Sequence, residues 1–191
     1  NDAGMLITPE KLEFGKGYSL KEVSAPYGYV LSHEAVKFDV TEENSTEESG
    51  VTIVAVNLGN YAQKGIIKIS KTGEGFASVT AADGVYQPVY TVQGLAGATY
   101  EIKAAADIYT PDGTLRCSAG EVVDTVTTGA DGMAESKPLY LGKYEITEMK
   151  APDGMVVNKD AHTTELVYAG QEIEITETAA NFCNDRQKTR I

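Results

Sequence analysis

The sequence is poor in the residues that most often carry chemistry. Its 191 residues include no tryptophan, only two histidines, His33 and His162, and only two cysteines, Cys117 and Cys183. The histidines have no neighbouring Cys or His and no Ser nucleophile motif, so we interpret them as loop residues. Two cysteines are too few for a disulfide framework and their spacing fits no zinc site, although it leaves open whether they pair. We therefore expect no metal site and no cofactor.

Positive charge and long apolar runs are also scarce. The chain has 16 Lys and Arg against 28 Asp and Glu, which gives a net charge of −12. Binding to phosphates requires a basic surface, so nucleic acid is not an expected partner. No apolar run approaches the roughly 20 residues of a membrane-spanning helix, so we expect no membrane insertion in this segment.

What the sequence does contain favours β structure. It has 19 glycines and 11 tyrosines, with many Thr and Val residues. Residues 72–75 are expected to close the first strand, and residues 76–93 to form a long connection with at most a short strand at 89–92. About seven or eight short strands, with turn signals every 8–12 residues, predict an all-β, Ig-like sandwich. The predicted strands are 66–71, 98–104, 122–127, 143–149, 163–167 and 173–182.

The chain also contains an internal repeat. Residues 12–30 return as residues 139–156, with one residue inserted in the first copy, and residues 57–64 align with residues 181–188. So long a period indicates tandem domains rather than a solenoid. We expect residues 1–63 to be the C-terminal portion of a preceding domain whose front strands are missing. Two further parts follow, a complete domain at residues 64–188 and the start of a next unit at residues 189–191.

One carboxylate falls on an apolar strand face. Alternation places Tyr144, Ile146 and Glu148 on the same side of their strand. Burying a carboxylate is costly unless it is protonated, hydrogen-bonded or paired. On the last strand, Asn184 ends an apolar face that includes Phe182. In the repeat, Glu22 corresponds to Glu148 and Asn60 to Asn184, so each unit has one inward Glu and one inward Asn.

Four segments resemble, in order, the signatures of CnaB-type (SpaA-type, prealbumin-like) domains of Gram-positive pilins and adhesins. They are residues 65–71, 95–102, 142–154 and 182–184. In that family a Lys on the first strand forms an intramolecular isopeptide bond with an Asn or Asp on the last strand, assisted by a buried Glu. The resemblance carries these roles to Lys68, Asn184 and Glu148. Glu22 and Asn60 are the equivalent positions in the truncated first unit.

The residues themselves leave two candidates for the lysine. Alternation groups Lys71 with Ile67 and Ile69, which favours an inward Lys71, whereas Lys68 falls on the other face. Family members with the same Lys-x-x-Lys spacing use the first lysine, so the resemblance favours Lys68.

The chemistry accounts for these residue types. Burial favours the neutral amine and the neutral acid, so the lysine can attack the Asn184 side-chain carbonyl while Glu148 relays protons and ammonia leaves. Each domain reacts once, so we expect autocatalytic maturation and not an enzyme. A glycosidase pair of Glu145 and Glu148 is excluded because the two point to opposite faces of a strand.

The resemblance implies a structural stalk or spacer module of a cell-surface adhesin or pilin-like protein. Such a module is extracellular, on the Gram-positive cell wall, and its partners are neighbouring domains of the same protein. The alternative is a ligand-binding adhesin domain that contacts a host protein or glycan through residues 73–94 or residues 109–120.

Overall fold

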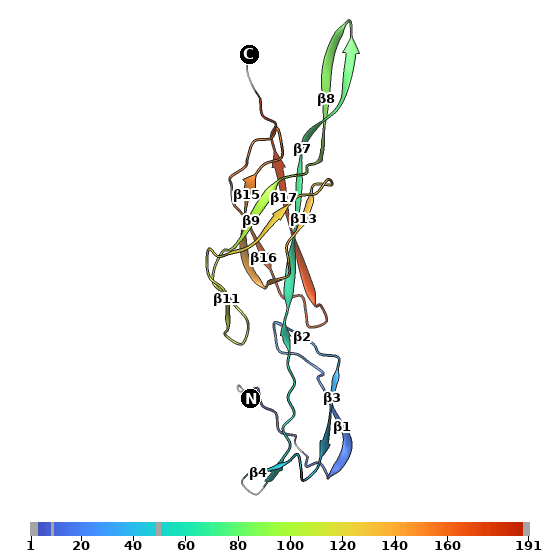
Figure 1. The fold of residues 1–191 in the computed structure, drawn as a ribbon, viewed down its shortest axis with the longest axis vertical. Coiled ribbons are helices and arrows are strands. Elements are labelled where there is room, and N and C mark those ends of the chain that lie inside the picture. Colours follow the sequence, from blue (N-terminus) through green and yellow to red (C-terminus); the bar gives the residue numbers. More distant parts are fainter. Residues whose placement is uncertain (1–3, 9, 49–50, 189–191) are drawn as a thin grey trace. The chain divides into compact units, whose positions relative to one another are not determined.

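The computed structural model describes residues 4–8, 10–48 and 51–188, and these fold as β-strands joined by turns and loops (Figure 1). The chain forms two compact units: Asn1–Ala25 with Leu31–Tyr61, and Pro26–Val30 with Ala62–Ile191. The described residues include no helix, which confirms the all-β prediction, and hence none that is long and apolar enough to cross a membrane. The predicted start of a next unit, residues 189–191, lies outside the described residues.

The first unit is built from two antiparallel strand pairs. β1 (Gly15–Lys21) pairs with β3 (Ala35–Val40), and β4 (Thr46–Glu48) pairs with β5 (Val51–Ile53). The rings of Tyr18 and Phe38 stack across the first pair, with centroids 5.7 Å apart. A further short strand, β2 (Tyr29–Val30), belongs to the second unit and pairs with β6 (Tyr61–Ala62).

The second unit is a sandwich of two sheets. One sheet has the order β12-β9-β15-β16, and all its neighbours are antiparallel. The other is organised around β7, which pairs in parallel with β17 and antiparallel with β8, β13 and β14; β10 and β11 form a separate ribbon. The bounds are β7 (Lys64–Ala82), β8 (Val85–Gly94), β9 (Thr99–Ala104), β10 (Ile108–Tyr109), β11 (Leu115–Cys117), β12 (Val122–Thr127), β13 (Met133–Glu135), β14 (Leu139–Tyr140), β15 (Gly142–Lys150), β16 (His162–Leu166) and β17 (Ile175–Asn184).

The core follows from the two-residue period of the strands. Every second residue is buried between the sheets in the first ten residues of β7, in β9, and in β15 from Tyr144 to Glu148. The largest of these are Ile67, Ile69, Tyr100, Ile102, Tyr144 and Ile146. Five of the six strands predicted within residues 66–182 are confirmed to within a few residues, and so is the inward face of residues 144–148. The sixth, predicted at residues 66–71, is present but much longer.

The prediction of a loose connection at residues 72–93 is wrong. β7 continues to Ala82 and forms a hairpin with β8 that extends past the rest of the sandwich (Figure 1). Its turn is Asp83-Gly84, whose φ angles of 52° and 76° suit a tight hairpin. The glycines near its base allow close backbone approach instead of a turn, since a Cβ on Gly94 would lie 2.1 Å from the Asp131 carbonyl oxygen.

The two cysteines do not pair. Cys117 is half-buried at the end of β11, whereas Cys183 is exposed on β17, and both are free thiols. The fold of the second unit therefore depends on packing and hydrogen bonds, without a disulfide.

Candidate functional site

Three buried polar side chains meet between the two sheets of the second unit. Lys71 is the next inward residue of β7 after Ile67 and Ile69, and Asn184 ends the neighbouring strand β17. Glu148 comes from β15 in the facing sheet. The period of each strand thus brings one amine, one amide and one carboxyl group to the same place.

The three groups are in direct contact. The Lys71 Nζ donates a hydrogen bond to Asn184 Oδ1 and lies 3.2 Å from Glu148 Oε1. The Asn184 Nδ2 donates to both Glu148 oxygens at 2.9 Å. Lys71 is 1% exposed to solvent, Asn184 is 4% exposed and Glu148 is 3% exposed. Water is therefore largely excluded from a site that contains an amine, an amide and a carboxyl group.

Two further donors hold the Glu148 carboxyl group. The backbone N–H of Asn158 donates to Oε2 at 2.8 Å, and the Tyr100 hydroxyl donates to Oε1 at 3.3 Å. The carboxyl group is thus both paired and hydrogen-bonded, as its burial requires. Among the described residues, every buried side-chain nitrogen or oxygen atom has a hydrogen-bond partner.

The two candidate lysines occupy opposite environments. Burial lowers the pKa of the Lys71 ammonium, and the hydrogen bond and charge of Glu148 only partly oppose that effect. Lys68 faces outward and lies 2.6 Å from Glu177 Oε2, and this hydrogen bond raises the pKa of Lys68. Of the two, Lys71 is the one that can lose its proton more readily.

The structure therefore brings Lys71, and not the expected Lys68, to Asn184 and Glu148. Lys68 is three positions before Lys71, so the alternation of β7 directs it away from the core and from Asn184. The alternation argument placed Lys71 inward, as observed; the family's spacing favoured Lys68, which does not lie at Asn184.

The backbone on either side of Lys71 is held in place. Its N–H donates to the Gly132 carbonyl at 2.7 Å, and its carbonyl accepts from the Leu95 N–H at 3.0 Å. Gly132 has a φ of +78°, and a Cβ there would lie 2.4 Å from the Lys71 carbonyl oxygen. Only glycine fits this position, where the chain passes close to the lysine.

The first unit repeats half of the arrangement. The Asn60 Nδ2 donates to Glu22 Oε1 at 2.7 Å, and the Ser32 N–H donates to Glu22 Oε2 at 3.1 Å. Ser32 follows Glu22 by ten positions, as Asn158 follows Glu148. Glu22 and Asn60 are half-buried, whereas their counterparts are buried.

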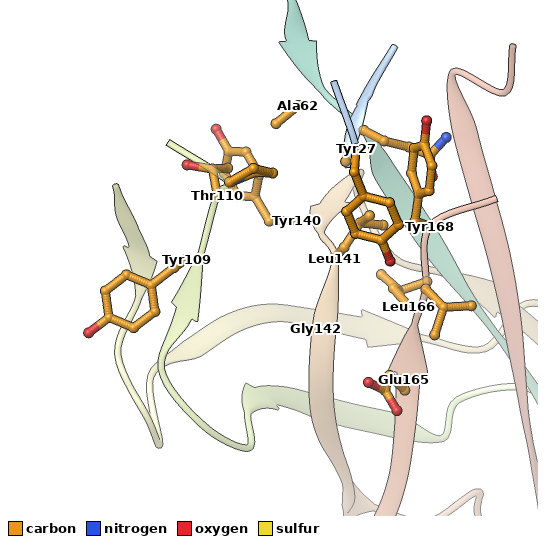
Figure 2. Close-up of a pocket in the computed structure, with 14 residues that line it drawn as sticks. Tyr27, Ala62, Tyr109, Thr110, Tyr140, Leu141, Gly142, Glu165, Leu166 and Tyr168 are labelled. Carbon is orange, nitrogen blue, oxygen red and sulfur yellow. The ribbon is translucent and has the colours of Figure 1, made fainter. Parts of the chain in front are cut away.

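A separate cavity of about 270 Å³ lies elsewhere in the second unit (Figure 2). Tyrosines from four segments line it, and the rings of Tyr27 and Tyr168 are in contact, with centroids 4.6 Å apart. Its lining includes the Glu165 side chain but none of the residues around Lys71. No group of His, Cys, Asp or Glu suited to a metal ion occurs in the part of the chain that the structure describes.

Sequence reasoning missed two partners of Glu148. Asn158 contributes only its backbone N–H, so its residue type carries no signal. Tyr100 lies directly across from Glu148 in the pairing of β9 with β15. Its inward position follows from alternation, but its partner depends on which strands are neighbours.

Comparisons with known proteins agree with this architecture. A family model described as the SpaA prealbumin-like fold domain matches residues 1–54 and 89–180. No curated protein matches the chain. Among solved structures, the Bacillus anthracis TIE protein is 27% identical, with a TM-score of 0.50, over 88% of this chain and 25% of that one.

Two pilins are more distant. The minor pilin GBS52 of Streptococcus agalactiae is 16% identical, with a TM-score of 0.43, over 82% of this chain and 60% of that one. The major pilin SpaD of Corynebacterium diphtheriae is 22% identical, with a TM-score of 0.41, over 65% of this chain and 30% of that one. The chain thus spans a quarter of the TIE protein and less than two thirds of either pilin.

Proposed function

Because the chain belongs to the family of SpaA prealbumin-like fold domains, we propose that its second unit is a structural module of a bacterial surface protein, locked by an isopeptide bond between Lys71 and Asn184. The observation that carries this proposal is the buried contact of the Lys71 amine with the Asn184 amide and the Glu148 carboxyl group. A spacer needs resistance to unfolding more than it needs a ligand, and such a bond would supply that resistance.

The reaction begins with a proton transfer. Glu148 Oε1, 3.2 Å from the Lys71 Nζ, takes a proton from the ammonium and leaves a neutral amine. The lowered pKa of Lys71 makes this transfer easier than for an exposed lysine. The amine then attacks the Asn184 Cγ, which forms the new C–N bond and moves an electron pair onto Oδ1.

Collapse of this intermediate expels the amide nitrogen. Glu148 delivers a proton to Nδ2, which lies 2.9 Å from both carboxyl oxygens, and the original C–N bond breaks. The Lys71 Nζ then loses its second proton to the same carboxyl group, which passes it to the departing Asn184 nitrogen. That nitrogen leaves as ammonium, and Glu148 is again a carboxylate, as at the start. Fixed proximity provides much of the acceleration, since well-oriented intramolecular groups reach effective molarities of roughly 10⁵ M or more.

Intact mass spectrometry tests the proposal. The purified chain should be lighter than its sequence by one ammonia molecule, and proteolysis should yield one cross-linked pair of peptides containing Lys71 and Asn184. Glu148→Ala should keep the full mass, because the proton carrier is gone. A wild-type chain of full mass would refute the isopeptide bond and leave a β-sandwich with a buried ion pair.

The surroundings of this module follow from the repeat and the family. We propose that residues 1–63 are the C-terminal portion of a preceding domain of the same kind, and that the Glu22–Asn60 pair awaits a lysine from strands outside this chain. Residues 64–188 are the complete domain, and residues 189–191 open a next one. The protein lies outside the cell on a Gram-positive surface, in contact with neighbouring domains or other subunits.

One observation favours a second function, that of a ligand-binding adhesin domain. The β7–β8 hairpin exposes an apolar face with Phe76, Val79, Tyr86 and Val92, which is available to a host protein or glycan. Saturable binding to a matrix protein that is lost in Tyr86→Ser, but kept in Thr80→Ser on the other face, would support this function.

A further inference from the structure

The Tyr100 hydroxyl is a polar group at the site that the reaction above leaves without a task. Tyr100 is 0% exposed, and its ring packs on Phe182 with centroids 4.6 Å apart. Its partner across the strand pair is Glu148, and its hydroxyl donates to Oε1, the oxygen atom nearest the Lys71 amine. The ring packing fixes the hydroxyl beside the atom that receives the first proton.

We propose that Tyr100 is a positioning residue for the cross-linking reaction, acting through Glu148. The inference rests on the proposed function, because it concerns the same bond between Lys71 and Asn184. The Tyr100 hydroxyl donates to the Glu148 carboxyl group, which in turn contacts the reacting amine and amide, so Tyr100 sets the orientation of that carboxyl group.

The carboxyl group must remain in place while its proton content changes. A hydroxyl group can donate to a carboxylate oxygen and can rotate to accept from the same oxygen once it is protonated. Tyr100 therefore has a hydrogen bond to Oε1 both before and after that atom takes the proton of Lys71. The Asn158 N–H holds Oε2 in the meantime, so both oxygens continue to face the Asn184 Nδ2.

Tyr100 itself stays protonated. Burial, followed by the charge of Glu148 and the hydrogen bond to it, raises the pKa of the phenol far above its ordinary value. The phenol is thus a permanent partner and not a competing base. The other groups around Glu148 are Lys71 from β7, Asn184 from β17 and the Asn158 N–H, and the exposed Cys183 adds a weaker interaction with Lys71.

Tyr144 offers a matched control. It is also fully buried on the inner face of its strand, but its hydroxyl donates to the Tyr140 carbonyl and not to Glu148. Tyr144→Phe and Tyr100→Phe each remove one buried hydroxyl and keep the ring. Only Tyr100→Phe removes a donor from the carboxyl group.

The experiment follows bond formation from the unreacted chain. Wild type, Tyr100→Phe and Tyr144→Phe are purified from inclusion bodies in denaturant, diluted into the same refolding buffer, and sampled over time for loss of one ammonia molecule. Because Tyr100→Phe loses a hydrogen bond to a charged group, it should close the bond about tenfold more slowly or worse. Tyr144→Phe should match the wild type.

Melting temperatures separate positioning from folding. Tyr100→Phe and Tyr144→Phe are each also measured in an Asn184→Ala background, where no bond can form. Slow bond formation in Tyr100→Phe, at a melting temperature that matches that of Tyr144→Phe, is the expected result. A rate loss that is accompanied by a correspondingly lower melting temperature would overturn the inference.

The remaining outcomes are equally decisive. A wild type that loses ammonia while Tyr100→Phe reacts at the same rate overturns the role of Tyr100 and leaves the proposed function intact. A wild type that keeps its full mass overturns both.

Discussion

Replacing Lys71 by methionine is the sharpest perturbation of the site. Methionine has a similar length and packs well in a buried position, but it has no nucleophile. We expect Lys71→Met to fold, to retain the full mass of its sequence and to melt at a lower temperature than the wild type. The matched change, Lys68→Met, removes a half-buried, outward-facing lysine of the same strand and should leave both the mass loss and the melting temperature of the wild type.

The size of the effect follows from the loop that the bond closes. Lys71 and Asn184 are 113 positions apart. In the chain-entropy model, a cross-link that closes a loop of about 100 residues stabilises the folded state by about 5 kcal/mol. For a domain of this size each kcal/mol shifts the melting temperature by about 3–5 °C, so the second unit of Lys71→Met should melt about 15–25 °C lower.

The assay combines intact mass with differential scanning calorimetry of the three chains. Calorimetry reports the second unit as its own transition if the two units unfold separately. Loss of ammonia in Lys71→Met, or retention of the full mass in Lys68→Met, would refute the assignment of Lys71. A melting temperature of Lys71→Met within a few degrees of the wild type would refute the cross-link as the main source of stability.

Three other predictions concern the surroundings of the site. The rate of bond formation should rise with pH and reach its plateau below pH 10.5, because burial lowers the pKa of Lys71 from the ordinary lysine value of 10.5. The rate is measured by mass spectrometry over time, and a rate that still rises up to pH 10.5 would contradict the assignment of Lys71. Gly132→Ala should destabilise the second unit by about 3 kcal/mol or more in denaturant unfolding, since its Cβ would meet the Lys71 carbonyl oxygen at 2.4 Å. The control Gly97→Ala, with open space around its Cβ, should cost only about 1–2 kcal/mol. Equal losses of stability in the two variants would argue against the clash. Ser136→Ala should cost about 1–3 kcal/mol in the same assay because the buried Ile67 N–H loses its acceptor at 2.9 Å, and an unchanged midpoint would mean that water replaces the hydroxyl.

Alternation predicted the inward faces correctly because it depends only on the geometry of a single strand. It placed Glu148 with Tyr144 and Ile146, and Lys71 with Ile67 and Ile69, and all six are buried. The family's spacing favoured Lys68, which faces outward, because counting along a motif does not register which face of β7 each residue occupies.

What sequence could not supply was the meaning of its glycines and prolines. Residues 72–75, with Gly73, and residues 76–93, with Pro88, were expected to end the strand and form a connection, yet Gly73 and Pro88 lie in a ten-pair ladder between β7 and β8. Glycine there lets neighbouring segments of the backbone approach closely. Proline is tolerated because β8 is an edge strand that pairs only with β7 among the described strands. The partnership of Tyr100 with Glu148 was equally out of reach, because it depends on the order of strands in the sheet.

The parallel pairing of β7 with β17 has a mechanical consequence. Ladder partners run from Lys64 with Ile175 to Gly73 with Asn184, so the chain enters this ladder at one end and leaves it at the other. Tension between the entry and the exit loads all of these hydrogen bonds together in shear, instead of opening them one by one. With Lys71 joined to Asn184, tension would pass along the first residues of β7, from Lys64 to Lys71, and then across one amide bond to Asn184 at the end of β17. The more than one hundred residues between them, which could extend by roughly 3.5 Å each, would carry none of it.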